Sequence, residues 1–269
     1  MSSVPSVKTH LLDISATCHP LSLPKAIILF GGSAAVLRFC VYYLMPALMQ
    51  AGVILFWAFL ISYSLALSLI MIAALIGIRL EGYPLQFSTF RTRLRFRKLS
   101  WKGLLWVIGL FLIGFLGSGL LIPTAQGIAR IPWLSPPSFL PAAVNPLIPP
   151  QVSLSEFMGL SLRGQWWIAA VYFLFESFFD VFGEELWFRG YLLPRQELVH
   201  GNWTWLIHGI LWTLFHVAIY PWYLLYLLPT ALTVTIAAQK LKNTWASYLV
   251  HFIGNVLLAL LPVVLGIIG

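Results

Sequence analysis

The sequence predicts an all-α fold, a polytopic transmembrane helical bundle of about seven to eight spans. Of its 269 residues, 60% are hydrophobic and 9% are charged, and the mean hydropathy is +0.89. About a quarter of the residues of an average soluble chain are charged. The composition therefore excludes a disordered chain, a collagen-like chain and an ordinary soluble enzyme, and it predicts an integral membrane protein.

Seven apolar stretches are long enough to cross a bilayer, which takes roughly 20 residues. They cover Pro24–Leu44, Ala47–Ile78, Gly103–Ile122, Gln165–Leu193, Trp203–Tyr220, Trp222–Ala238 and Trp245–Ile268. The second stretch is too long for one straight span, so we expect a tilt, a kink or a pair of helices there. We expect that the first stretch is not a cleavable signal, because more than 20 residues precede it and no convincing cleavage site follows a short apolar core.

Basic residues predict the orientation of the bundle. Seven of the 16 Lys and Arg residues lie in the 79–102 linker, namely Arg79, Arg91, Arg93, Arg95, Arg97, Lys98 and Lys102. Lys240 and Lys242 mark a second basic loop, and Arg195 lies in a third. Alternating spans place all three loops on one side, which the positive-inside rule makes cytoplasmic. The N-terminus is then cytoplasmic too, in a multi-pass protein of the plasma membrane if the source is bacterial.

The 123–164 connection is expected on the opposite side as a stiff, weakly charged outer loop, because it is rich in proline and has only Arg130 and Arg163 as basic residues. We divide the chain into an N-terminal cytoplasmic segment (1–23), N-terminal transmembrane helices (24–164) and a C-terminal helical region (165–269). The formal charge of +8 is concentrated in membrane-flanking loops, so we expect no nucleic-acid partner. Two cysteines, Cys18 and Cys40, are too few for a disulfide framework.

Half of the eight acidic residues occupy ten consecutive positions of the fourth span: Glu176, Asp180, Glu184 and Glu185. Each ionised side chain near a helix centre costs about 2.5–3.5 kcal/mol. These acids must therefore face a polar interior, be partly protonated or pair with a cation. Because positions four apart share a helix face, Glu176, Asp180 and Glu184 form one stripe.

Glu185 and Arg189 form a second face, in the order that favours an ion pair within a helix. We expect Arg189 to neutralise Glu185, so Glu184 is the carboxylate that remains available as a base. A structural salt bridge or an ion path remains the alternative interpretation of the acidic cluster.

Histidines in the later spans favour a catalytic role for the acidic cluster over a purely structural one. His216 and His251 lie within apolar spans, and Asn255 follows His251 on the same helix face. His208 is also intramembrane, but alone it is better explained by a hydrogen bond between helices. The remaining three histidines, His10, His19 and His200, lie in tails or loops. An acid pair, a histidine and a His-x-x-x-Asn pair supply a base, its partner and two groups that stabilise an oxyanion.

These motifs resemble those of the CPBP family of intramembrane proteases, which includes the CAAX prenyl endopeptidases and the bacteriocin-processing and Abi-type proteins. The family pattern is Glu-Glu-x-x-x-Arg, Phe-x-x-x-His and His-x-x-x-Asn on successive helices. Glu184-Glu185-Leu-Trp-Phe-Arg189 matches the first motif and His251-Phe-Ile-Gly-Asn255 the third. The second motif departs from the pattern, because Trp212 replaces Phe four residues before His216. The resemblance covers the chain from Ala170 onward.

The resemblance implies a catalytic role for five residues. Glu184 and His216 would activate a water for attack on a peptide carbonyl, and His251 and Asn255 would stabilise the tetrahedral oxyanion. Glu185 is the fifth residue of this catalytic group.

Arg189, together with Glu185, would hold the first motif in place. No cofactor is required for this chemistry. Zinc is the alternative, with Glu184, His216 and His251 as its ligands, but the His-Glu-x-x-His helix that favours zinc is absent.

The expected function is therefore that of an intramembrane endopeptidase acting on a membrane-anchored protein or peptide in the lipid bilayer, of CAAX-like, bacteriocin or other type. Two alternatives remain at this point. A proton- or cation-coupled transporter would use the acidic stripe as a relay, but it gives His251 and Asn255 no role. A non-catalytic membrane scaffold would retain the fold without the activity.

Overall fold

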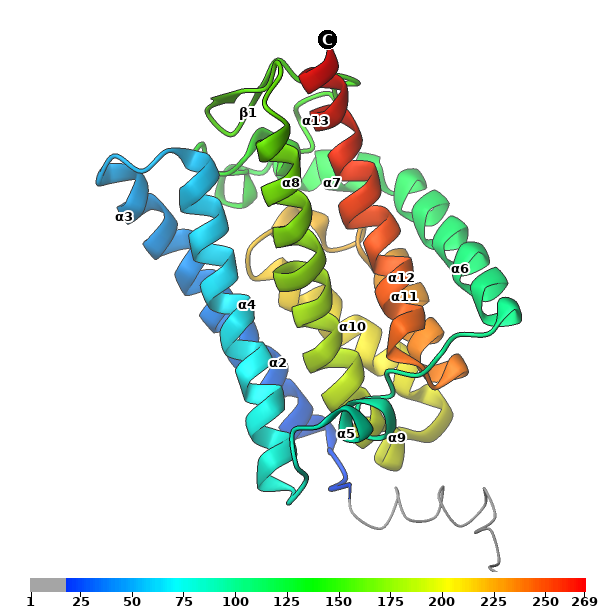
Figure 1. Ribbon diagram of the computed structural model, residues 1–269. Helices are drawn as coiled ribbons and strands as arrows, with labels where there is room; N and C mark the ends of the chain where they lie inside the picture. Colours follow the sequence, from blue (N-terminus) through cyan, green and yellow to red (C-terminus); the bar gives the residue numbers. More distant parts are fainter. Residues whose placement is uncertain (1–17) are drawn as a thin grey trace, which may run out of the picture.

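A computed structural model describes residues 18–269 as a bundle of helices (Figure 1). In these residues the sheet content is one antiparallel pair of two-residue strands, β1 (Glu156–Phe157) and β2 (Leu160–Ser161). The all-α prediction is confirmed. Residues 1–17, which hold His10 and most of the expected N-terminal cytoplasmic segment, lie outside the described part of the chain.

The first helical run is longer than the sequence predicts. It comprises α2 (Leu23–Phe39), the π-helical η1 (Cys40–Leu44) and α3 (Met45–Gln50), and α4 (Leu55–Leu80) follows after a short turn. The predicted boundary near Leu44 is wrong because the π-helical segment precedes Pro46 and takes up the loss of its N–H group. The chain turns instead at Gly52, whose φ of 88° suits glycine.

The segment from 81 to 165 connects the two halves of the bundle. Its elements are α5 (Phe87–Thr92), α6 (Trp101–Leu120), α7 (Ile122–Ala129), η2 (Pro132–Leu134), η3 (Ala142–Val144), β1 and β2. The 123–164 connection is therefore not a plain loop, since it contains most of α7, two 3-10 turns and the strand pair. It lies at the end of the bundle away from α5 (Figure 1).

The C-terminal half begins with one long helical run. It consists of α8 (Trp166–Leu174), the π-helical η4 (Phe175–Phe182) and η5 (Glu185–Leu192), and α9 (Leu193–His200). Arg195 therefore lies in a helix, which corrects its predicted place in a loop. The chain reverses at Gly201, whose φ is 53°. The remaining elements are η6 (Gly201–Trp203), α10 (Thr204–Val217), η7 (Pro221–Tyr223), α11 (Leu228–Leu241), α12 (Thr244–Phe252), η8 (Ile253–Leu258) and α13 (Ala259–Ile268).

Five helical runs in the described residues are long and apolar enough to cross a membrane. They are Leu23–Gln50, Leu55–Leu80, Trp101–Leu120, Trp166–Val217 and Thr244–Ile268. The predicted stretches Trp203–Tyr220 and Trp222–Ala238 correspond to α10 and α11, of 14 residues each, which pack against each other inside the bundle. Of the two, α10 also forms the end of the run Trp166–Val217, and the count of seven to eight spans stays a prediction.

All three basic segments lie at one end of the bundle. Glu197 of α9 accepts two hydrogen bonds from Arg95, at 3.0 and 2.8 Å, and lies 2.6 Å from the Lys242 ammonium. Arg195 pairs with Glu81 at 2.5 Å. The grouping of the basic segments at one end agrees with the alternation argument, and the assignment of that end to the cytoplasm stays a prediction.

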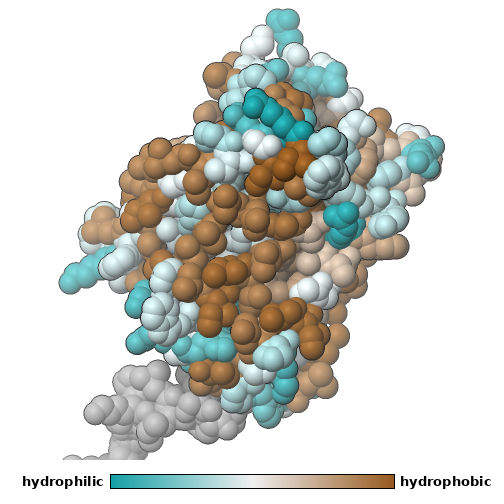
Figure 2. Space-filling view, turned by 180° about the vertical axis from the view of Figure 1, so that it is seen from behind, coloured by the Kyte–Doolittle hydropathy of each residue, from teal (hydrophilic) through white to brown (hydrophobic). Residues whose placement is uncertain are grey.

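The outer surface has the apolar character of a membrane protein. Figure 2 shows hydrophobic side chains gathered over the middle of one face. On α4 the exposed apolar residues repeat at helical spacing: Ile61, Leu65, Leu69, Ile72 and Ile76. Such a stripe is a lipid-facing surface.

Candidate active site

The candidate site residues come from three helical segments of the C-terminal half. Glu184, Glu185 and Arg189 lie where η4 passes into η5 on the long helical run. His216 lies in the last turn of α10, and His251 lies in α12. The local π-helical geometry, with its i→i+5 hydrogen bonds, is a feature often found at functional sites.

Glu185 is the centre of a fully buried charged group. Its Oε1 atom lies 3.1 Å from Nη1 of Arg189 and 3.2 Å from Nδ1 of His251. The exposed fractions of these side chains are 0% for Glu185 and Arg189 and 2% for His251. The ion pair that the Glu185–Arg189 spacing predicts is therefore present, and a histidine from another helix completes it.

Arg189 is held by its charge and by an aromatic ring. Its guanidinium carbon lies 3.7 Å from the centre of the Trp212 ring, and its nitrogen atoms lack a hydrogen bond of good geometry. Attraction to Glu185 and the cation–π contact thus stabilise a buried positive charge that has few hydrogen-bond partners.

Glu184 faces a different pair of groups. Its Oε2 atom accepts a hydrogen bond of 2.8 Å from the indole N–H of Trp212. Its Oε1 atom lies 3.8 Å from Nε2 of His216, which is too long for a direct hydrogen bond. The His216 side chain is 16% exposed and that of Glu184 is 3% exposed, so a water molecule that reaches both groups would enter past His216.

The tautomer of His216 follows from its second contact. Nδ1 lies 2.9 Å from the backbone carbonyl of Trp212. A carbonyl oxygen only accepts hydrogen bonds, so Nδ1 is the donor and carries the hydrogen. In a neutral ring, Nε2 is then the acceptor nitrogen, and it is the atom directed towards Glu184.

Trp212 joins the two carboxylates and their partners. Besides its contacts with Glu184 and Arg189, its ring packs edge-on against His216 at 4.7 Å and against His251 at 5.1 Å between ring centres. The sequence marks this position only as a departure from the Phe of the family motif. The indole N–H is the signal that identifies it, because Phe has no group that can donate to Glu184.

Asn255 lies beside a further acid. Its amide nitrogen donates a hydrogen bond of 3.2 Å to Asp180 in η4. An amide group has two N–H bonds, so this contact uses one of them. Asp180, a member of the predicted acidic stripe, thus also anchors the last residue of the third motif.

His208 has the structural role that its sequence context suggests. It is fully buried, and its Nδ1 atom lies 2.5 Å from Oε1 of Gln196 in α9. This contact links α10 to α9 and leaves His208 outside the groups around Glu184 and Glu185.

The three residues of the zinc alternative, Glu184, His216 and His251, do not make one ligand cluster. Within residues 18–269, no three His, Cys, Asp or Glu side chains are placed to hold a metal ion. His251 is directed to Glu185, whereas His216 faces Glu184. This arrangement does not fit a zinc centre, so the chemistry below is derived from the side chains alone.

Comparison with known protein families gives a match. A model of the type II CAAX prenyl endopeptidase Rce1-like family matches residues 165–257. Searches of curated proteins and of solved structures give no match. The matched segment contains all six candidate site residues, and it confirms the resemblance that the three motifs indicate.

Proposed function

We propose that this protein, whose residues 165–257 match the type II CAAX prenyl endopeptidase Rce1-like family, hydrolyses a peptide bond of a membrane-associated protein. The observation that carries the proposal is the facing pair of Glu184 and His216, 3.8 Å apart in a nearly buried setting. A carboxylate and an acceptor nitrogen at this separation can both contact one water molecule.

Glu184 acts as the general base in this proposal. It takes a proton from the water while His216 holds the water through Nε2, and the water oxygen attacks the peptide carbonyl carbon. When the C–N bond breaks, the same proton passes from Glu184 to the leaving amine. General acid–base catalysis of this kind typically contributes about 10²–10⁴ in rate.

His251 and Asn255 are proposed to stabilise the oxyanion of the tetrahedral intermediate. The Glu185 carboxylate accepts from Nδ1 of His251, so Nε2 donates to an oxyanion only when the ring is protonated. Glu185 offsets that positive charge, and Arg189 holds Glu185 in place through their ion pair of 3.1 Å. Asn255 contributes the amide hydrogen that Asp180 does not use.

A cleavage assay on reconstituted protein tests the proposal. Vesicles containing the full chain are incubated with membrane-anchored peptides that end in a prenylated or an unprenylated CAAX-type sequence, or that carry a bacteriocin-type leader. Mass spectrometry then identifies the products. We expect at least one class to be cut by the wild type and left intact by Glu184→Gln.

The same vesicles separate the protease from the alternatives. A pH-sensitive dye enclosed in them reports proton flux. Proton flux that depends on Glu184, with no peptide of any class cleaved, would instead establish the transporter. Absence of both activities in a folded protein would point to the scaffold.

A further inference from the structure

A cavity of about 730 Å³ lies at the basic end of the bundle, outside the candidate active site. Its apolar wall is built from Phe90 of α5, Phe96 of the following loop, Phe182 of η4 and Trp245 of α12. The rings are in contact: Phe96 lies 5.5 Å from Phe182 and 5.0 Å from Trp245 between ring centres. Three segments far apart in sequence thus form one aromatic lining.

Two basic side chains border this aromatic lining. Arg91 and Lys98 line the cavity and are exposed, and no carboxylate in the described residues forms an ion pair with either. The acids at this end among residues 18–269, Glu81 and Glu197, are already paired with other arginine or lysine side chains. The cavity therefore has an apolar interior and uncompensated positive charge at its border.

We propose that this cavity binds an anionic phospholipid, with an acyl chain against the aromatic lining and the headgroup phosphate on Arg91 and Lys98. Basic pockets at the cytoplasmic ends of membrane helices attract anionic headgroups, and Arg and Lys pair strongly with phosphate. Phe87, which also lines the cavity, is 80% exposed, so α5 presents an apolar side chain towards the lipid. A soluble phosphate would leave the aromatic lining without an occupant.

The proposed lipid would contact the helical run that carries the acids. Phe182 precedes Glu184 by two residues in that run, and its ring is part of the cavity wall. The proposal concerns binding alone and does not depend on proteolysis, so it can fail or hold whatever the peptide assay gives.

Native mass spectrometry of the full chain tests the proposal. The purified protein is titrated with phosphatidylglycerol, with phosphatidylcholine of the same chains, and with glycerol phosphate. We expect the wild type to retain phosphatidylglycerol in preference to both other ligands. The double variant Arg91→Gln with Lys98→Gln should bind it about tenfold more weakly, because two headgroup contacts are lost.

A matched control removes the same charge from the same end of the bundle. Lys102→Gln with Lys240→Gln changes two exposed lysines outside the cavity and should leave the affinity unchanged. Equal weakening in both double variants would overturn the proposal, because the effect would then be general surface charge. Equal binding of the two lipids, or binding of glycerol phosphate as tight as that of the lipid, would overturn it as well.

Discussion

The helices α2 to α6 and the helical run from α8 to α9 place their polar groups differently. Over its 26 residues, α4 has one charged side chain, Arg79 at its C-terminal end, and its exposed stripe is apolar. The run from Trp166 to His200 instead buries Glu184, Glu185 and Arg189. In the first region α4 thus exposes an apolar surface, whereas the second region encloses charged side chains.

The two regions share π-helical segments but differ in the side chains that these segments carry. In the N-terminal region η1 ends two residues before Pro46, and in the C-terminal region η5 ends two residues before Pro194, so a missing backbone donor follows both. The residues of η1 are all uncharged, whereas η4 and η5 carry Asp180, Glu185 and Arg189. The comparison shows that the charged side chains, and not the π-helical geometry by itself, locate the site.

Replacing the proposed base should produce the largest effect. Glu184→Gln keeps the shape of the side chain and an acceptor for Trp212, but it removes the ability to take a proton. We expect peptide cleavage to fall by about 10²–10⁴ with the thermal unfolding temperature unchanged. Cleavage at the wild-type rate would show that the Glu184–His216 pair is not the source of the activity.

Glu185→Gln should act mainly on stability. It leaves Arg189 as an uncompensated buried charge, which typically costs about 3–5 kcal/mol. The expected result is a lower unfolding temperature or a lower yield. Adding Arg189→Gln should restore part of the stability, and the same addition should not restore cleavage to Glu184→Gln. A Glu185→Gln protein as stable as the wild type would contradict the structural role.

Trp212→Phe tests the departure from the family motif. The variant keeps an aromatic ring at this position and loses the N–H group that donates to Glu184 at 2.8 Å. A hydrogen bond to a charged group contributes about 1.5–3 kcal/mol, so we expect kcat to fall about tenfold, with a shift in the pH profile of cleavage. Unchanged kcat and an unchanged profile would limit Trp212 to packing.

Removal of metal ions tests whether cleavage depends on zinc. A chelator should leave cleavage unchanged, since the residues around Glu184 do not form a ligand cluster. The metal content of the purified active protein, measured by mass spectrometry, should be well below one ion per chain. Loss of cleavage on chelation, with recovery on addition of zinc, would establish the metal-dependent alternative.

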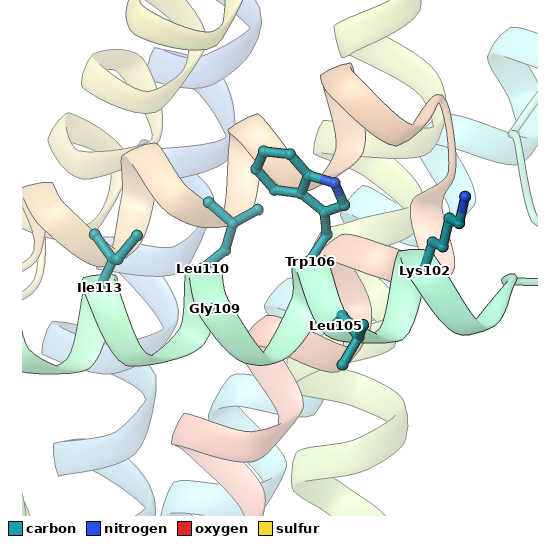
Figure 3. A pocket seen from close by; sticks show the side chains of 6 residues that line it. All are labelled: Lys102, Leu105, Trp106, Gly109, Leu110 and Ile113. Atoms are coloured by element: carbon teal, nitrogen blue, oxygen red, sulfur yellow. The ribbon is translucent and has the colours of Figure 1, made fainter.

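Substitution of two glycines of α6 by alanine should have the smallest effect, and it should act on stability alone. A Cβ atom at Gly114 would lie 2.5 Å from Oγ1 of Thr233 and 3.3 Å from the Cα atom of Thr230, whereas one at Gly109 would meet nothing within 4 Å. Gly109 lies in an open groove on the surface of α6 (Figure 3). We expect Gly114→Ala to lower stability by about 1–3 kcal/mol and Gly109→Ala to leave it unchanged or slightly higher. Equal unfolding temperatures would contradict the close packing of α6 on α11.

Local contacts of the site could be predicted from the sequence, and contacts between helices could not. The Glu185–Arg189 pair follows from helix geometry, since both residues lie on one face. The Trp212–Glu184 and Asn255–Asp180 contacts depend on how neighbouring helices are rotated, which hydropathy and spacing do not specify.

Prediction of the fold from the sequence has the same limit. The all-α class follows from composition, and the grouping of the basic segments at one end follows from alternation. The lengths of α10 and α11 do not, because hydropathy does not show where within an apolar stretch a helix begins and ends. The end of the first helix does not follow from the sequence for a related reason, since the effect of Pro46 depends on whether a π-helical segment absorbs it.

Single-turnover cleavage in oxygen-18 water tests the central claim, that Glu184 activates a water and does not itself attack the peptide. With enzyme in excess over a cleaved peptide, the account predicts one labelled oxygen in the new C-terminal carboxylate of the product. An unlabelled product, with the label found on Glu184, would contradict the account, because the carboxylate would then be the nucleophile.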